Sequence, residues 1–187
     1  MRDRIQHALE TTLAAANIPG AVAVVGNSAG TLAEVAVGTK GPGGPPLAQD
    51  DLFQIASMTK AIASVAAMQL VEQGRLSLDD DIGTLLPQLA NAAVLEGFDD
   101  EGKPVTRPAA GPITLRQLLT HTSGFGYEFM SAELTQWRLH NPANSGTLAS
   151  LNQPLLADPG TRWIYGISTD WVGLAVEAVS GMRLGDW

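Results

Sequence analysis

The alternation of apolar and polar positions divides the chain into a small N-terminal part and a longer, mostly helical part. Residues 3–16 carry apolar side chains at helical spacing and predict an amphipathic helix, which Pro19 and Gly20 end. Two short apolar runs follow, 21–25 and 31–37, joined by a loop of small residues. Runs of this kind around such a loop are typical of a β-hairpin.

The longest stretch of helix-forming composition begins near Ser57 and ends at Gly74. It is rich in Ala, Met, Gln, Leu and Glu, and a left-handed glycine is a common helix end. Ser57 therefore lies at or near the first helical turn, and Lys60 follows one turn later on the same side. The unpaired N–H groups of this turn make it electropositive. The pattern S-x-x-K thus presents a hydroxyl beside an amine, which can activate the serine if burial and nearby positive potential lower the lysine pKa.

Beyond this helix the pattern predicts shorter elements separated by Gly- and Pro-rich segments. We expect a short helix to Leu86, a surface excursion over 96–112, a short helix capped by Thr114, and a helix over 131–140. A last helix, capped by Ser168 or Thr169, continues to Val179, where Gly181 ends it.

Composition and charge narrow the classes of function. The chain has 187 residues, enough for one domain with a real core, and its formal net charge of −8 argues against nucleic acid or anionic membrane as partners. It contains no cysteine, and its three histidines show no ligand spacing, so we expect no metal and no other cofactor. The charged N-terminal helix lacks the apolar core of a signal peptide, and no apolar run is long enough to span a bilayer. A cytoplasmic location is the default expectation.

A second serine motif competes with S-x-x-K. Residues 26–30 match G-x-S-x-G, the nucleophile elbow of α/β-hydrolases, with Ser28 as the serine. The elbow requires a strand, a sharp turn and then a helix, whereas the residues after Gly30 predict another strand. We therefore interpret Ser28 as an exposed loop residue and reject a Ser-His-Asp triad built on it.

Three segments taken together resemble one known family. They are Ser57-Met-Thr-Lys60 with the helix that follows, Leu118-Leu-Thr-His121-Thr-Ser-Gly124, and the segment from Pro159 through Tyr165 to Gly181. Their order and spacing resemble the serine β-lactamase-like family, which contains class C β-lactamases, family VIII carboxylesterases and related acyltransferases. The resemblance is closest to the esterase and acyltransferase branch.

The resemblance implies an α/β (α+β) fold of the serine β-lactamase and penicillin-binding-protein type, with a helical region and part of an antiparallel sheet. Residues 1–187 would be the N-terminal portion of one catalytic domain. Within it, 1–50 hold a helix and the first sheet strands, and 51–187 form the mostly helical region.

The resemblance assigns catalytic roles to three residues. Ser57 matches the acylated nucleophile, and Lys60 matches the amine that assists its deprotonation. Tyr165 matches the tyrosine of the Y-x-N motif, which shares the role of base and protonates the leaving group. A charged Lys60 would favour the phenolate of Tyr165, so the two groups would titrate as a coupled pair.

Further residues are candidates for binding substrate. The third position of Y-x-N is Ile167 in place of asparagine, which removes an amide and favours plain esters over β-lactams. Tyr127, Glu128 and Trp137 are expected to line the acyl or alcohol pocket. His121 could act as a general base, but its segment packs behind the site in the resembling family, and we interpret it as a structural anchor.

The resemblance also implies that the chain is truncated. In the family, a K-T-G-like or W-G-G-like third motif and one backbone donor of the oxyanion hole come from strands beyond the position of Trp187. A lone two-stranded hairpin is marginal in water, which supports the same expectation. The missing C-terminal half would then be a second chain, a proteolytic partner, or a segment outside these residues.

The expected function is hydrolysis of small carboxylic esters through an acyl-enzyme on Ser57. Two enzymatic alternatives stay open: an acyltransferase, in which an alcohol replaces water, and a β-lactamase or peptidase that acts on amides. The alternatives outside catalysis are a ligand-binding relative that keeps only the fold, and an inactive fragment. The presence of Ser57, Lys60 and Tyr165 together argues against the ligand-binding relative.

Overall fold

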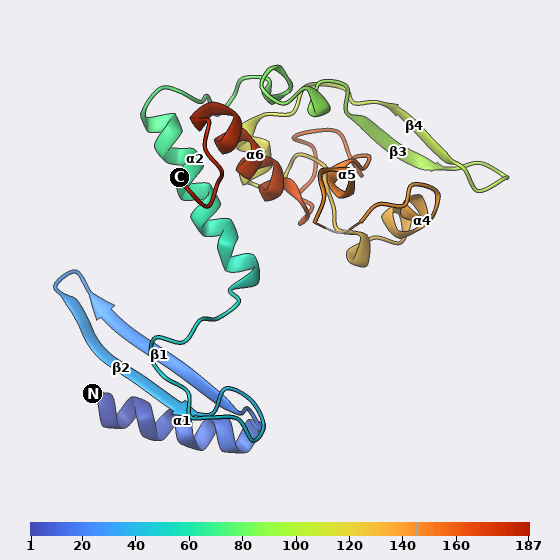
Figure 1. Cartoon of the computed structure of the whole chain (residues 1–187). Helices are drawn as coiled ribbons and strands as arrows, with labels where there is room; N and C mark the ends of the chain where they lie inside the picture. Colours follow the sequence, from blue (N-terminus) through green and yellow to red (C-terminus); the bar gives the residue numbers. More distant parts are fainter. Residues whose placement is uncertain (145) are drawn as a thin grey trace. The chain divides into compact units, whose positions relative to one another are not determined.

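The computed structural model describes residues 1–144 and 146–187, which form two compact units, Met1–Ile55 and Ala56–Trp187. The first unit consists of helix α1 (Arg2–Ala16) and an antiparallel hairpin of β1 (Gly20–Asn27) and β2 (Gly30–Gly38), shown in blue in Figure 1. The predicted helix and hairpin are therefore confirmed.

One face of the hairpin packs on α1. Leu13 of α1 and Ala33 and Val35 of β2 are buried, and alternate residues of a strand point to the same face. Ser28 lies in the turn between the two strands, so its surroundings are strand, turn and strand. The rejection of a nucleophile elbow at Ser28 is confirmed.

The second unit is built around two helices that pack side by side, α2 (Thr59–Glu72) and α6 (Ser168–Ser180) (Figure 1). A 3₁₀ turn over Ala56–Met58 precedes α2. At the other end Gly74 has φ 68°, and its N–H donates to Val71 while that of Arg75 donates to Leu70. This is the hydrogen-bond pattern of a Schellman helix end, as predicted for Gly74.

The core of the second unit is assembled from α2, α6 and the segments between them. Its fully buried side chains are aliphatic and include Leu70, Leu115, Leu118, Leu155, Val172 and Val176. The apolar face of α6, which carries Val172, Ala175 and Val176, packs into this core. Helix α6 ends at Gly181, with φ 75°, but it begins without a side-chain cap because Ser168 bonds to Ser123 instead.

Two of the shorter predicted helices are confirmed. Thr114 caps α3 (Leu115–Leu119), where its side chain and that of Gln117 form a reciprocal capping box. Ser131 caps α4 (Ala132–His140). The expected helix to Leu86 is instead a 3₁₀ turn over Ile82–Thr84, and a second 3₁₀ turn follows over Pro87–Leu89. Helix α5 (Leu148–Leu151) was not predicted.

The surface excursion predicted over 96–112 is wrong. This region contains an antiparallel hairpin of β3 (Ala93–Phe98) and β4 (Pro104–Pro108), which is green in Figure 1. Its glycines and prolines are typical of a loop, but Gly97 lies at a bulge of β3, and Pro104 and Pro108 lie at the two ends of β4, which is an edge strand among the residues that the structure describes. Two backbone hydrogen bonds of 2.8 Å from the segment at Leu155 hold β3, and such a contact has no local sequence signal.

No helix over residues 1–144 and 146–187 has the length and apolar character needed to cross a membrane.

Candidate active site

The structure brings Ser57 and Lys60 together at the start of α2. Ser57 lies in the 3₁₀ turn and is exposed, whereas Lys60 lies in the first turn of α2 and is half-buried. The Lys60 ammonium donates to the Ser57 hydroxyl across 3.4 Å, a long hydrogen bond. The hydroxyl and amine of the S-x-x-K pattern are therefore neighbours, and local helical geometry suffices to explain it.

Tyr165 reaches the same pair from the segment that precedes α6. Hydrogen bonds with Ser57 and then with Lys60 lower the pKa of its phenol below the ordinary value, and the nearby Lys60 charge acts in the same direction. The Lys60 ammonium lies 5.2 Å from the centre of the Tyr165 ring. The three residues predicted to be catalytic thus form one cluster.

Tyr127 is a second phenol on Lys60. The ammonium donates to its hydroxyl across 2.9 Å, and the Tyr127 and Tyr165 rings meet edge-on with centroids 5.5 Å apart. The sequence marked Tyr127 only as a pocket residue. No local pattern could reveal this contact, because the two partners are 67 positions apart.

The electrostatics of Lys60 differ from the expectation. Burial lowers its pKa, but the hydrogen bonds to Tyr127 and Tyr165 outweigh burial and leave the pKa above its ordinary value. A lowered lysine pKa, the condition for Lys60 to act as the base, is therefore not met, because hydrogen bonds to two phenols favour the charged amine. Lys60 is held in its charged form, and Tyr165 is the group whose pKa moves toward neutrality.

The absence of a side chain at Gly166 explains how the tyrosines come together. A Cβ on Gly166 would lie 2.4 Å from the carbonyl oxygen of Phe125 and 2.5 Å from the backbone of Gly126. Real Cβ atoms do not approach this closely, so the two backbones can touch only because Gly166 has no side chain. Tyr165 precedes Gly166 and Tyr127 follows Gly126, so this contact places the phenols side by side.

His121 packs behind Tyr165. Its ring centroid is 4.8 Å from that of Tyr165, and its carbonyl accepts a hydrogen bond of 2.8 Å from Ile164. Burial and then the Lys60 charge lower the pKa of the imidazole, which favours the neutral form. Its backbone is left-handed, with φ 56°. A neutral ring that supports the tyrosine agrees with the interpretation of His121 as a structural anchor.

A cavity of about 830 Å³ opens beside the cluster. Of the predicted site residues it is lined by Ser57, Lys60, Tyr127, Glu128 and Ile167. This size is typical of small-molecule sites.

Two residues near the cavity differ from the sequence interpretation. Trp137 is not part of the cavity lining and packs its ring against the guanidinium of Arg138, 4.8 Å away. Asp170 of α6 does line the cavity, although no motif pointed to it. Desolvation raises the pKa of its carboxyl, and the Lys60 charge opposes this effect. The Asp170 carboxyl adds a polar group to a cavity that also presents the Ser57 hydroxyl.

Comparison with known proteins agrees with this fold. The Beta-lactamase family model matches residues 5–187. The chain therefore belongs to the β-lactamase family. Its helices and small antiparallel sheets also superpose on simvastatin synthase LovD from Aspergillus terreus, with a TM-score of 0.84 and 36% identity over 95% of this chain and 47% of that one.

Curated relatives include an esterase and an acyltransferase. Lovastatin esterase of Penicillium rubens is 44% identical over 74% of this chain and 36% of its own length. Monacolin J acid methylbutanoyltransferase of Aspergillus terreus is 42% identical over 75% of this chain and 35% of its own length. The chain thus spans about half the length or less of the proteins that it matches.

Proposed function

We propose that this chain carries the nucleophile and proton-transfer groups of a serine hydrolase that cleaves small carboxylic esters through an acyl-enzyme on Ser57. The observation that carries the proposal is the cluster of Ser57, Lys60 and Tyr165, in which the Lys60 ammonium donates to the serine hydroxyl and lies 5.2 Å from the ring of Tyr165, whose pKa is lowered by Ser57 and Lys60. We also propose that residues 1–187 form the first portion of one catalytic domain.

In the first step Tyr165 acts as the base. Its phenolate accepts the proton of Ser57 as the serine oxygen attacks the ester carbonyl, and the charged Lys60 stabilises the phenolate. The N–H groups of the 3₁₀ turn and of the start of α2, including that of Ser57, stabilise the oxyanion that forms. Lys60 contributes as a cation at neutral pH, because its pKa lies above the ordinary value.

The same groups complete the cycle. Tyr165 returns its proton to the leaving alkoxide as the bond from the carbonyl carbon to the alcohol oxygen breaks, which leaves the acyl group on Ser57. A water molecule then attacks the acyl carbon and gives a proton to Tyr165. The tetrahedral intermediate collapses, Ser57 leaves with that proton, and the carboxylic acid is released.

Acyl transfer is the second candidate function. A methylbutanoyltransferase among the relatives supports it, because an alcohol in place of water would regenerate Ser57 by the same proton movements. The ratio of new ester to free acid, measured with increasing concentrations of an added alcohol, separates the two activities. A β-lactamase activity is less favoured because Ile167, which lines the cavity, offers no amide, and turnover of a chromogenic cephalosporin tests it.

The proposal is tested with p-nitrophenyl esters and the protein expressed from its complete coding sequence. The wild type should release a burst of p-nitrophenol equal to the enzyme concentration, and Ser57→Ala should release none. Ser28→Ala is the matched control, because Ser28 lies in the β1–β2 turn, and it should keep the burst. A normal burst from Ser57→Ala would refute the assignment.

A further inference from the structure

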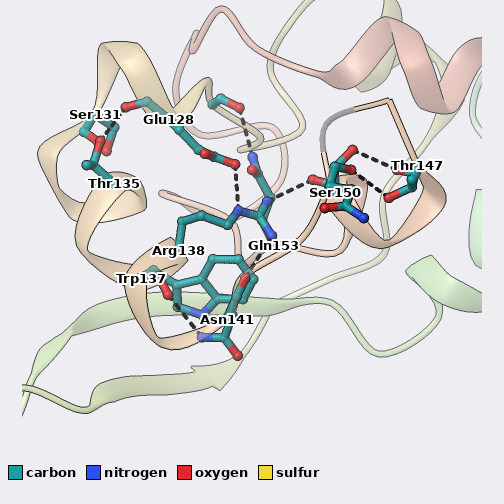
Figure 2. A network of polar contacts seen from close by, with 11 residues as sticks. Glu128, Ser131, Thr135, Trp137, Arg138, Asn141, Thr147, Ser150 and Gln153 are labelled. Carbon is teal, nitrogen blue, oxygen red and sulfur yellow. Dashed lines mark hydrogen bonds and ion pairs between the residues drawn. The ribbon is translucent and has the colours of Figure 1, made fainter.

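The backbone of Tyr127 is held by polar side chains on both of its flanks. On one flank, the side-chain amide of Gln153 donates to the carbonyl of Gly126 across 2.8 Å. On the other, Arg138 donates from Nε to the carboxylate of Glu128 across 2.6 Å (Figure 2). We call Arg138 and Gln153 the Tyr127 brace.

Arg138 joins several separate segments. Besides Glu128, its guanidinium donates to the carbonyl of Asn141 at 3.2 Å and to that of Ser150 at 2.8 Å (Figure 2). Only 13% of its side chain is exposed, and the Trp137 ring covers the guanidinium. An arginine whose donors are used in this way fixes geometry in a manner that one charge–charge contact cannot.

Gln153 is also buried and hydrogen-bonded. It is 8% exposed, and the hydrogen bond to Gly126 is its link to the loop that precedes Tyr127. Loss of this bond would leave a buried carbonyl without a partner, which is costly. Gln153 also lines the active-site cavity together with Glu128, the residue that pairs with Arg138 of α4.

The turn between the two flanks is fixed as well. Thr135 of α4 donates to the carbonyl of Glu128 at 2.7 Å, and the N–H of Met130 donates to the carbonyl of Tyr127 at 3.1 Å. Tyr127 therefore has little freedom of backbone movement, and its hydroxyl stays 2.9 Å from the Lys60 ammonium.

We propose that Arg138 and Gln153 are positioning residues, which hold the Tyr127 hydroxyl on Lys60 and thereby hold the Lys60 ammonium against Ser57 and Tyr165. This inference rests on the proposed function for its effect on catalysis. Its geometric part concerns the environment of Lys60 and can be measured without turnover. Arg138 acts only through Glu128 and Tyr127 and contacts no reacting atom.

A double-mutant cycle between Arg138→Met and Tyr127→Phe tests the proposal. Each single variant should lower kcat/KM on the order of ten-fold, the rate equivalent of one lost hydrogen bond to a charged group. The double variant should be no worse than Tyr127→Phe alone, because both changes remove the same contact. Losses that multiply would overturn the proposal. Glu128→Gln takes the place of Arg138→Met if that variant does not fold.

Competitive acetylation of Lys60, followed by mass spectrometry over a range of pH, provides the readout that needs no turnover. The titratable groups around Lys60 are Tyr127, Tyr165, His121 and Asp170. Tyr127→Phe and Arg138→Met should both lower the midpoint of Lys60 labelling, since both weaken the hydrogen bond that favours the charged amine. Gln153→Leu should do the same, and Arg138→Lys, which retains a cation for Glu128, should restore part of the difference.

Arg116→Met is the matched control, because Arg116 forms a bidentate pair with Asp79 at 2.7 and 2.8 Å and has no contact with the Tyr127 segment. It should leave the Lys60 midpoint unchanged. An unchanged midpoint in Arg138→Met and Gln153→Leu would overturn the brace even if the esterase proposal holds. A burst that persists in Ser57→Ala would refute the esterase proposal and leave the acetylation result to stand on its own.

Discussion

Two phenols lie beside Lys60, and each is held in place by a different kind of contact. Tyr165 is held by close packing, since its neighbour Gly166 touches the backbone of Gly126 and its ring lies on His121. Tyr127 is held by polar side chains, with Gln153 on one flank and the ion pair of Glu128 with Arg138 on the other.

The two kinds of contact differ in how they respond to a substitution. Close packing leaves no room for an added methyl group, so it fixes Tyr165 firmly and fails abruptly. The support of Tyr127 depends on two or three directional hydrogen bonds, so the loss of one bond weakens the support while the others remain. The group proposed as the base is held by close packing, and the group that raises the Lys60 pKa is held by hydrogen bonds and an ion pair.

The largest expected effect separates the roles of the two phenols. Tyr165→Phe should lower kcat/KM by about 10²–10⁴-fold, the usual contribution of a general base. Tyr127→Phe should cost far less, because it removes a hydrogen bond to Lys60 and leaves the base in place. Steady-state kinetics on a p-nitrophenyl ester measures both. Equal losses would contradict the assignment of separate roles.

The next largest effect tests the close packing at Gly166 that holds Tyr165. Gly166→Ala should destabilise the fold by about 1–3 kcal/mol, because the added Cβ meets backbone atoms that cannot yield. Urea unfolding measures this, and the acylation rate should fall with it. Gly111→Ala is the control, since nothing lies within 4 Å of its Cβ position, and it should change stability by less than about 0.5 kcal/mol.

The pH profile sharpens the comparison further. Activity needs the Tyr165 phenolate, so kcat/KM should rise with pH through a pKa below that of free tyrosine, since hydrogen bonds with Ser57 and Lys60 lower it. It should fall again when Lys60 loses its proton at a pH above its ordinary pKa. Tyr127→Phe removes a bond that raises the Lys60 pKa, so the alkaline limb should move to lower pH. An alkaline limb that stays in place would contradict this coupling.

The smallest effect concerns His121. Asparagine tolerates the left-handed backbone at this position, so His121→Asn mainly removes the ring behind Tyr165. We expect a loss of roughly three- to ten-fold in kcat/KM, well below the 10²–10⁴-fold that a general base contributes. A loss of about 10²–10⁴-fold, together with the loss of the acid limb of the kcat/KM pH profile, would instead indicate that His121 is the base.

The local sequence determined the parts of this protein that depend on short-range geometry. The S-x-x-K spacing placed Lys60 beside Ser57, because residues three apart share a helix face, and Gly74 and Thr114 marked helix ends through their backbone preferences. The family resemblance added Tyr165. None of these conclusions required knowing how distant segments pack.

Only the tertiary structure decided the pKa of Lys60 and the contacts that hold the two tyrosines. The Lys60 pKa is raised because the two phenols come from loops far along the chain, and their hydrogen bonds outweigh burial. The β3–β4 hairpin depends on backbone hydrogen bonds with the segment at Leu155, and the brace depends on Arg138 bonding to two segments outside its own helix. Such contacts are set by the packing of the whole unit, which no short window of sequence encodes.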